Sequence, residues 1–430
     1  MLLFALGIAC LAIRNPDPLI NPVVYAEDGV WVADALTNGW LNTYLHARPD
    51  YFVFFNIFTL HISSVISSAL SGNPLFFLPQ SIAFVSYGFY SFVSVLAFIT
   101  IKRISNNYFA FLIYFITLMI PLGMSQNEII GRLLQIGFYM PFITLCLFFS
   151  REKIASRNFR LSIDALITLA AATNPVVFSV AGIYTIRKFI TSNDKKYFFN
   201  EHMLLLIMLG VLFLIIAPKM IGVGGIVEKF DGKNLIELIT ARSILYPFVF
   251  KFYSELNDVY SIILTIAYVL FCAFSYRKTN SKTIQDIIVI TSCALVIYIA
   301  ATVFGRPVLT GMLSGYQVTF LDRYFMGINI ISVFLFVICL TQLSIGIKTQ
   351  IITKIIYLSL LINYIINAGL IIENYSTRQA GKTTLFFSEQ LCLAEKSEDP
   401  DSLTIKIYPV PEWEMKVPSI YVNMLQCRKN

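Results

Sequence analysis

Long windows without a charged side chain constrain this sequence more than any other feature. Many windows of about 20 residues lack Asp, Glu, Lys and Arg, and this is the length at which a helix spans a bilayer. Charged residues make up 13% of the chain, about half the share found in soluble domains. In lipid every backbone group must be bonded within the protein, and these segments are too continuously apolar for barrel strands. The sequence therefore predicts an all-α polytopic membrane protein.

The apolar segments predict about eleven transmembrane helices. The N-terminal run, Leu2 to Ile13, covers only about 18 Å as a helix, which is short for a span. Residues 161–190 are expected to form a helical hairpin broken at Thr173-Asn174-Pro175, because proline disfavours helical conformation in the residue before it. The remaining expected spans are 75–101, 107–123, 131–150, 202–218, 258–276, 284–304, 323–345 and 355–372.

The distribution of Lys and Arg predicts the orientation of these spans. Fifteen Lys and Arg against five Asp and Glu lie in or beside loops 102–103, 151–160, 187–201, 277–282 and 346–354, whereas the rest of the chain holds seventeen against twenty. Basic loops are retained in the cytoplasm. The extracytoplasmic segments are then 14–50, 124–130, 219–257, 305–322 and the tail 373–430.

We expect a transmembrane domain over residues 1–372 and a small extracytoplasmic tail over 373–430, too short for a confident independent fold and therefore packed on the outer loops. Segment 51–71 is interpreted as a membrane-lying or re-entrant helix. If it spans instead, the N-terminal half of the topology inverts or gains a crossing.

The net charge of +7 does not indicate nucleic-acid binding, because no basic stripe is interleaved with aromatic residues.

The first outer loop carries two adjacent carboxylates, Glu27 and Asp28, in YAEDGVWVADALTNGWL (25–41). Apolar residues after Gly29 recur at helical spacing, which predicts an amphipathic interfacial helix with Trp31 and Trp40 as its membrane anchors. Asp28 at the helix N-cap would accept backbone N–H bonds and suit the helix dipole. That interpretation leaves Glu27 without a role.

Further charged residues recur where outer loops meet the membrane. In GMSQNEIIGRLLQ (123–135), Glu128 and Arg132 are spaced for an intrahelical ion pair, yet Arg132 would lie inside the membrane boundary, where ionisable groups usually face a polar cavity. An arginine at headgroup level can also bind a phosphate. Four arginines and three carboxylates are thus expected at one membrane surface, which predicts a lipid-phosphate site with an acid–base group. The candidate binding residues are Arg48, Asn127, Glu128, Arg132, Arg306, Arg323 and Tyr324.

Other site motifs are missing. There is no P-loop, no dinucleotide fingerprint and no nucleophile elbow, so a cytoplasmic nucleotide site is not indicated. The three histidines are scattered without a metal-ligand spacing, and we expect no zinc site. Cys392 and Cys427 could form a disulfide if the tail is extracytoplasmic.

On these residues the sequence resembles the GT-C superfamily of integral-membrane glycosyltransferases. The resemblance rests on YAEDG after the first apolar run, the amphipathic loop helix, Glu128 in the next outer loop, the TNP break, RYF at 323–325 and the tail segment IKIYPVPEWEMKVP. Its departures are the short first span and the lack of the large soluble C-terminal domain of oligosaccharyltransferases, which argues against peptide acceptors.

The resemblance implies a bacterial inner-membrane enzyme whose active site faces the periplasm. It would move a sugar from a polyprenyl-phosphate donor to an envelope glycan such as O-antigen. Asp28, with Glu27 second, would be the general base, and Arg323, Arg306 and Arg132 would stabilise the leaving lipid phosphate. No cofactor is required, although a divalent metal could bind Glu128 and the loop-one acids.

Three other functions stay open. A flippase or transporter of lipid-linked saccharides predicts charges at the midplane of several spans, whereas here they gather at one face. An O-antigen polymerase or ligase is suggested by loop 219–257, with five Lys and Arg beside Tyr246, Pro247 and Tyr253. A non-enzymatic membrane scaffold leaves the gathering of charged groups unexplained.

Overall fold

The computed structural model describes residues 1–222, 232–306, 308–313, 315–344, 347–376, 387–392, 394–396, 401–409 and 413–423. Two compact units make up the chain. Unit 1 comprises Met1–Phe92, Gln126–Gly137 and Asn374–Asn430, and unit 2 comprises Val93–Ser125 and Phe138–Glu373. Nearly all described residues that have regular structure are helical, which confirms the predicted helical class.

Unit 1 joins the N-terminal helices to the tail. Gly39, with φ +87°, separates a helix that ends at Asn38 from one that begins at Trp40, so the predicted amphipathic segment is a pair rather than one helix. The helices of unit 1 are α1 (Leu2–Arg14), α2 (Asp17–Ile20), α3 (Ala26–Asn38), α4 (Trp40–His46), α5 (Phe54–Ser71), the first part of α6 (Leu78–Ile104), α8 (Gln126–Ile129), α20 (Phe387–Cys392) and α21 (Ser419–Asn423).

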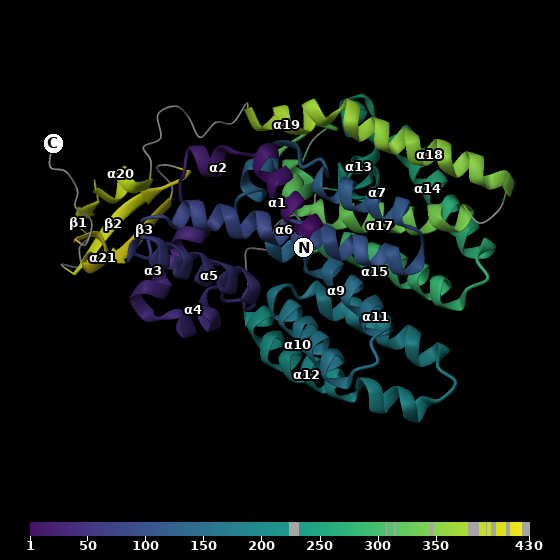
Figure 1. Cartoon of the computed structure of the whole chain (residues 1–430), viewed down its shortest axis with the longest axis horizontal. Coiled ribbons are helices and arrows are strands. Elements are labelled where there is room, and N and C mark those ends of the chain that lie inside the picture. The colour runs from purple at the N-terminus through teal and green to yellow at the C-terminus, as the bar shows by residue number, and fades with distance from the viewer. Residues whose placement is uncertain are drawn as a thin grey trace. The chain divides into compact units, whose positions relative to one another are not determined.

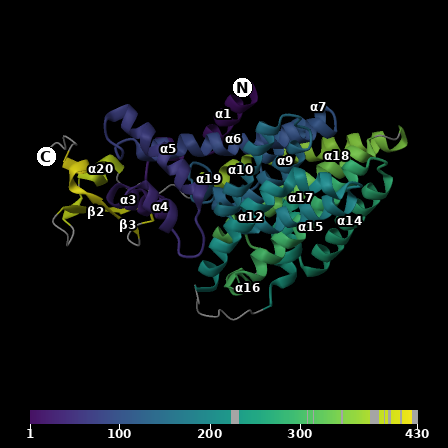
Figure 2. The same cartoon turned by 90° about the horizontal axis from the view of Figure 1, so that it is seen from below.

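The tail contributes a small antiparallel sheet, a departure from the all-α prediction. Its strands β1 (Glu395–Lys396), β2 (Ser402–Ile407) and β3 (Trp413–Pro418) lie in that order. Buried residues alternate with exposed ones at the end of β2 and along β3, as expected for a sheet with one covered face. The sheet lies against α3 (Figures 1 and 2).

Glycine at position 29 allows this close approach of helix and sheet. A Cβ there would lie 2.5 Å from Cδ1 of Ile407 and 2.7 Å from Cγ1 of Val24. Tyr408 extends the contact, because its N–H donates to the Val24 carbonyl and its carbonyl accepts from the Ala26 N–H. The tail therefore packs on segment 14–50, as expected for a piece too small to fold alone. Cys392 is disulfide-bonded, and its predicted partner Cys427 lies outside the described residues.

Unit 2 is built around α17 (Met326–Leu343), in which 94% of the residues are buried. Helices pack on α17 from several sides, so it faces protein rather than lipid (Figure 1). The other helices of this unit are the rest of α6, α7 (Asn107–Leu118), η1 (Gly123–Ser125), α9 (Met140–Arg151), α10 (Arg157–Thr173), α11 (Val176–Thr191), α12 (Lys195–Gly222), η3 (Glu237–Leu245), α13 (Tyr246–Val249), η4 (Phe250–Glu255), α14 (Asp258–Lys278), α15 (Lys282–Phe304), α16 (Val308–Met312), η5 (Phe320–Tyr324) and α18 (Ile347–Ile366), whereas η2 (Ile136–Tyr139) and α19 (Ala368–Ser376) cross the boundary between the units.

Six helices in the described part of the chain are long and apolar enough to cross a membrane, or seven if the bent pair Asn107–Leu118 and Gly123–Ile129 is one span. The chain is thus a multi-pass membrane protein, and eleven crossings are not confirmed. Segment 51–71 does form a helix, α5, that is long enough to span. The hairpin at 161–190 is confirmed, because α10 ends at Thr173 and α11 begins at Val176.

Two expected spans are shorter than predicted. Helix α7 ends at Leu118, just before Pro121 and Gly123, and the chain bends by 76° before α8. Residues 131–135 are not helical, so α9 begins only at Met140. Both corrections fall around the polar segment 123–135.

Candidate active site

Asp28 lies in the first turn of α3 and is fully buried. The helix begins at Ala26 with Tyr25 as its N-cap, so the interpretation of Asp28 as a helix cap is wrong. Its Oδ2 instead accepts the backbone N–H of Leu133 at 3.2 Å. The face that α3 buries also differs from the prediction: Trp31 is buried and donates to the Ala47 carbonyl rather than anchoring the helix at a membrane interface.

Burial raises the pKa of Asp28 from its ordinary value of 3.8 to about 7. Removing the carboxyl from water disfavours its charged form, and the Leu133 N–H and the Arg132 charge offset only part of that cost. A carboxyl with this pKa exchanges its proton near neutral pH. Perturbed groups of this kind are concentrated at functional sites.

Glu27, the preceding residue, is only half-buried. Within the described part of the chain its carboxylate has no hydrogen bond or ion pair, although it interacts electrostatically with Asp28 and Arg48. The backbone before it is strained, because Ala26 has φ +41°, a conformation that residues with a Cβ rarely adopt. Such strain persists where surrounding contacts hold it and is common at functional sites. Here the Tyr408 carbonyl holds the Ala26 N–H at 2.6 Å.

Arg132 is 3% exposed and lies in the irregular segment after α8. One Nη donates to the Val23 carbonyl at 2.7 Å, and the guanidinium carbon stands 5.4 Å from the Tyr25 ring centroid. The intrahelical ion pair with Glu128 that the residue spacing allowed is ruled out, because α8 ends at Ile129. Glu128 instead forms a hydrogen bond with the Tyr25 hydroxyl. Burial lowers the pKa of Arg132, and the nearby Asp28 charge acts in the opposite direction.

Buried polar side chains hold the backbone of residues 130–134 in place. The hydrogen bonds that do so all join segments distant in sequence. Tertiary structure therefore fixes the backbone of this loop and preorganises its N–H groups. The bonds run from Asn15 to the Ile130 carbonyl (2.8 Å), from Asn56 to the Leu133 and Leu134 carbonyls (2.8 Å each), from the Gly131 N–H to Ser86 (3.0 Å) and from Ser86 to the Arg132 carbonyl (2.8 Å).

Sequence reasoning missed Arg14, the last residue of α1. It is 1% exposed, and its Nε donates to Oε1 of Gln126 at 3.0 Å. The signal was present, because an arginine at the end of an apolar run must either reach water or find a partner. Asn127, in the same short helix as Gln126, is half-buried.

Arg48 forms a local ion pair rather than joining the buried group. Its Nε and one Nη bind the two Asp50 carboxylate oxygens at 2.8 and 3.0 Å, and its guanidinium lies over the Tyr51 ring. The bidentate geometry holds the pKa of Arg48 above its ordinary value. In unit 1 the structure thus brings together Asp28, Glu128 and Arg132, with Glu27 beside them.

The remaining predicted residues form a second cluster, within unit 2. The guanidinium carbons of Arg306 and Arg323 lie 4.3 and 5.2 Å from the Tyr324 ring centroid, and Phe138 meets that ring edge-on at 5.5 Å. All four side chains are half-buried. Arg306 has no ion pair with any described residue. Two cations stacked on one tyrosine without a carboxylate for Arg306 can bind an anion.

A buried ion network holds the turn that carries Arg323. Arg242 pairs with both Glu237 and Asp322, and the Tyr253 hydroxyl donates to Glu237 at 2.8 Å. Asp322 also closes a capping box with Thr319. Burial raises the pKa of Asp322 to about 6, and Arg242 acts against that shift. Arg242 was missed as an individual residue, although a lone arginine within LITARSIL signalled a buried partner.

The described residues contain no group of three or more His, Cys, Asp or Glu that could hold a metal ion. Asp28 and Glu128 each already accept a hydrogen bond from the protein. One hydrogen bond does not prevent a carboxylate from binding a metal ion, so metal binding by Glu128 and the loop-one acids stays a prediction.

A solved structure with a similar fold is an oligosaccharyltransferase of Archaeoglobus fulgidus, crystallised in complex with zinc and sulfate. The match has a TM-score of 0.51 and 14% sequence identity and covers 93% of this chain. The chain spans 56% of the length of that enzyme. At this identity the likeness shows a shared fold, and membership of the GT-C superfamily stays a prediction. No protein-family model matches the sequence, and no curated protein matches it significantly.

Proposed function

We propose that this protein is a membrane glycosyltransferase that moves a sugar from a lipid-phosphate donor to a hydroxyl acceptor. The single observation that carries the proposal is the acidic pair at the start of α3. One carboxyl is buried with a pKa near neutrality, and the other is half-exposed and unpartnered within the described residues, on backbone held in a strained conformation. The GT-C fold of the structural neighbour supports glycosyl transfer as the reaction class.

Glu27 is the better candidate for the general base than Asp28, because it is the accessible carboxylate. In the proposed reaction the acceptor oxygen forms a bond to the anomeric carbon while its proton passes to Glu27. The bond between the anomeric carbon and the phosphate oxygen breaks, and its electron pair leaves with the lipid phosphate. Asp28 acts as a positioning residue, because its bond to Leu133 ties α3 to the segment 130–134.

Arg306 and Arg323 are proposed to bind the donor phosphate, on the strength of their own geometry around Tyr324. Two stacked guanidinium groups can bind phosphate oxygens. Arg48 is less suited to this role, since Asp50 already occupies its guanidinium. The finer assignments of a polyprenyl-phosphate hexose, an envelope glycan acceptor and the periplasmic face of a bacterial inner membrane belong to this proposal.

The polymerase or ligase alternative loses part of its support. It rested on the basic residues of 219–257, and one of them, Arg242, is used in a buried ion network with Glu237 and Asp322. Residues 223–231, which include Lys229, lie outside the described residues.

The test is sugar transfer by the purified protein in liposomes, with polyprenyl-phosphate hexose as donor and a lipid-linked or lipopolysaccharide acceptor. Glu27→Gln is expected to lower kcat by about 100-fold or more, the usual contribution of a general base. The matched control is Asp34→Asn, which removes an acid from the same helix and is expected to retain activity. Full activity of a folded Glu27→Gln protein would refute the assignment of the base. Absence of transfer by the wild type with every lipid-phosphate donor would refute the reaction class.

A further inference from the structure

A cavity of about 490 Å³ lies in unit 2, where α11, α12 and α15 meet. It belongs to neither cluster of the proposed catalytic machinery. Its polar lining includes three cationic side chains, Arg187, Lys188 and Lys282, and one carboxylate, Asp286. The cavity therefore carries an excess of positive charge.

The ion pairs inside the cavity leave one cation available. Asp286 pairs with Arg187 at 2.7 Å and more loosely with Lys188 at 3.6 Å, and Lys188 also meets Glu152 at 2.8 Å. Lys282 is exposed and has no ion pair or hydrogen bond with any described residue. A ligand with a negative charge could pair with Lys282. The Arg187 guanidinium and the Lys188 ammonium also line the cavity, and their ion pairs with Asp286 and Glu152 hold them in place.

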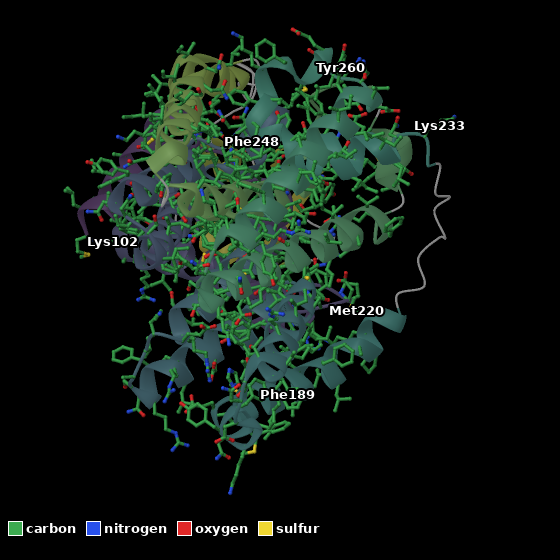
Figure 3. All side chains as sticks on the ribbon, turned by 90° about the vertical axis from the view of Figure 1, so that its right-hand side faces the viewer. Lys102, Phe189, Met220, Lys233, Phe248 and Tyr260 are labelled. Carbon is green, nitrogen blue, oxygen red and sulfur yellow. The ribbon has the colours of Figure 1, made fainter. Side chains whose placement is uncertain are left out.

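The flank of the cavity is apolar and exposed. Phe189, Tyr197 and Phe199 lie at the junction of α11 and α12, all three exposed. From there α12 presents outward-facing aliphatic residues along its length, and only 17% of the residues in its apolar stretch are buried. Figure 3 labels Phe189, near the cavity end of α12, and Met220, near the opposite end of that helix. A charged head in the cavity would thus be continuous with an apolar track of membrane-spanning length.

We propose that this cavity binds the phosphate headgroup of an anionic phospholipid whose acyl chains lie along α12. Basic pockets between membrane helices, on the side where Lys and Arg gather, suit anionic lipid headgroups. All three cations belong to or adjoin the loops whose composition predicts a cytoplasmic location. The aromatic residues at the rim are of the kind enriched at headgroup level.

The test compares lipid binding by delipidated protein, measured by native mass spectrometry. The probes are phosphatidylglycerol, phosphatidylcholine and the free headgroup, glycerol 1-phosphate. The wild type is expected to bind phosphatidylglycerol more tightly than either of the other two. Lys282→Ala is expected to weaken phosphatidylglycerol binding about fivefold, the equivalent of about 1 kcal/mol for one lysine near a membrane surface, and Lys282→Glu to weaken it further.

Lys153→Ala is the matched control, because Lys153 is an exposed lysine on a neighbouring basic loop outside the cavity. It is expected to leave phosphatidylglycerol binding unchanged. Equal affinity of the wild type for the two phospholipids, or unchanged binding by Lys282→Glu, would overturn the proposal. Binding of glycerol 1-phosphate as tight as that of the whole lipid would overturn the lipid as the occupant and indicate a soluble anion. Unfolding temperatures in phosphatidylcholine show that the variants are folded.

Discussion

Replacing Asp28 with asparagine is expected to make the stability of the protein less dependent on pH. The carboxyl is fully buried, and its pKa lies at about 7 in the folded protein against an ordinary value of 3.8. That difference corresponds to about 4 kcal/mol of free energy. Asparagine can still accept the Leu133 N–H through its carbonyl oxygen, and it never ionises. The substitution therefore removes the charge and keeps the contact.

Proton linkage gives the direction in which pH changes the free energy of unfolding. Because the folded state holds the Asp28 proton more tightly than the unfolded state, the stabilisation is fully present below about pH 4 and is lost as pH rises to about 7. Between pH 5 and pH 8 this group alone lowers the free energy of unfolding by about 3 kcal/mol. Asp28→Asn is thus expected to gain stability relative to wild type over that range.

The assay is thermal unfolding of both proteins in the same detergent at pH 5, 6, 7 and 8. Asp34→Asn is the control, a substitution of the same kind at a half-exposed acid of α3. A stability difference between wild type and Asp28→Asn that does not change over this range would refute the reasoning. So would a wild type that gains stability relative to the variant as pH rises.

Three further substitutions test the remaining contacts. Gly29→Val is expected to lower the free energy of unfolding by about 1–3 kcal/mol and to speed proteolysis of the tail, because the new side chain would overlap Ile407; an unchanged cleavage rate in limited proteolysis would contradict this. Arg242→Met should lower the free energy of unfolding by about 3–5 kcal/mol, because it leaves Asp322 buried without its ion-pair partner. A variant as stable as the wild type in thermal unfolding would show that the ion network does not stabilise the fold. Arg306→Ala should raise KM for the lipid-phosphate donor at least tenfold with an unchanged KM for the acceptor, whereas equal effects on both would indicate a structural role.

The helical membrane class could be predicted from local features alone. A window of about 20 apolar residues permits few structures in lipid, whatever surrounds it. The hairpin break at Asn174-Pro175 was equally local, since proline acts on the residue before it. The strands of the tail were also visible in principle, because SLTIKI and EMKV alternate polar and apolar residues.

The segment 123–135 could not be predicted in this way. Its apolar residues suited a helix, but Asn15, Asn56 and Ser86 hold its backbone in an irregular path through long-range bonds. These partners cannot be identified from the spacing of residues within the segment. The same limit applied to Arg132, because Glu128, the partner that the residue spacing allowed, bonds to Tyr25 instead.

The sequence by itself determined that two carboxylates stand side by side in the segment that forms the start of α3, and that a helix-capping role could account for only one of them. Which of them is buried was decided only by tertiary structure. Successive side chains on an α-helix point about 100° apart, so Glu27 and Asp28 must face different surroundings. What lies on each side comes from far along the chain: Leu133 is 105 residues away and bonds Asp28, and the tail sheet covers Gly29. Local patterns identify the two carboxylates, whereas long-range packing decides which of them is buried and which is accessible.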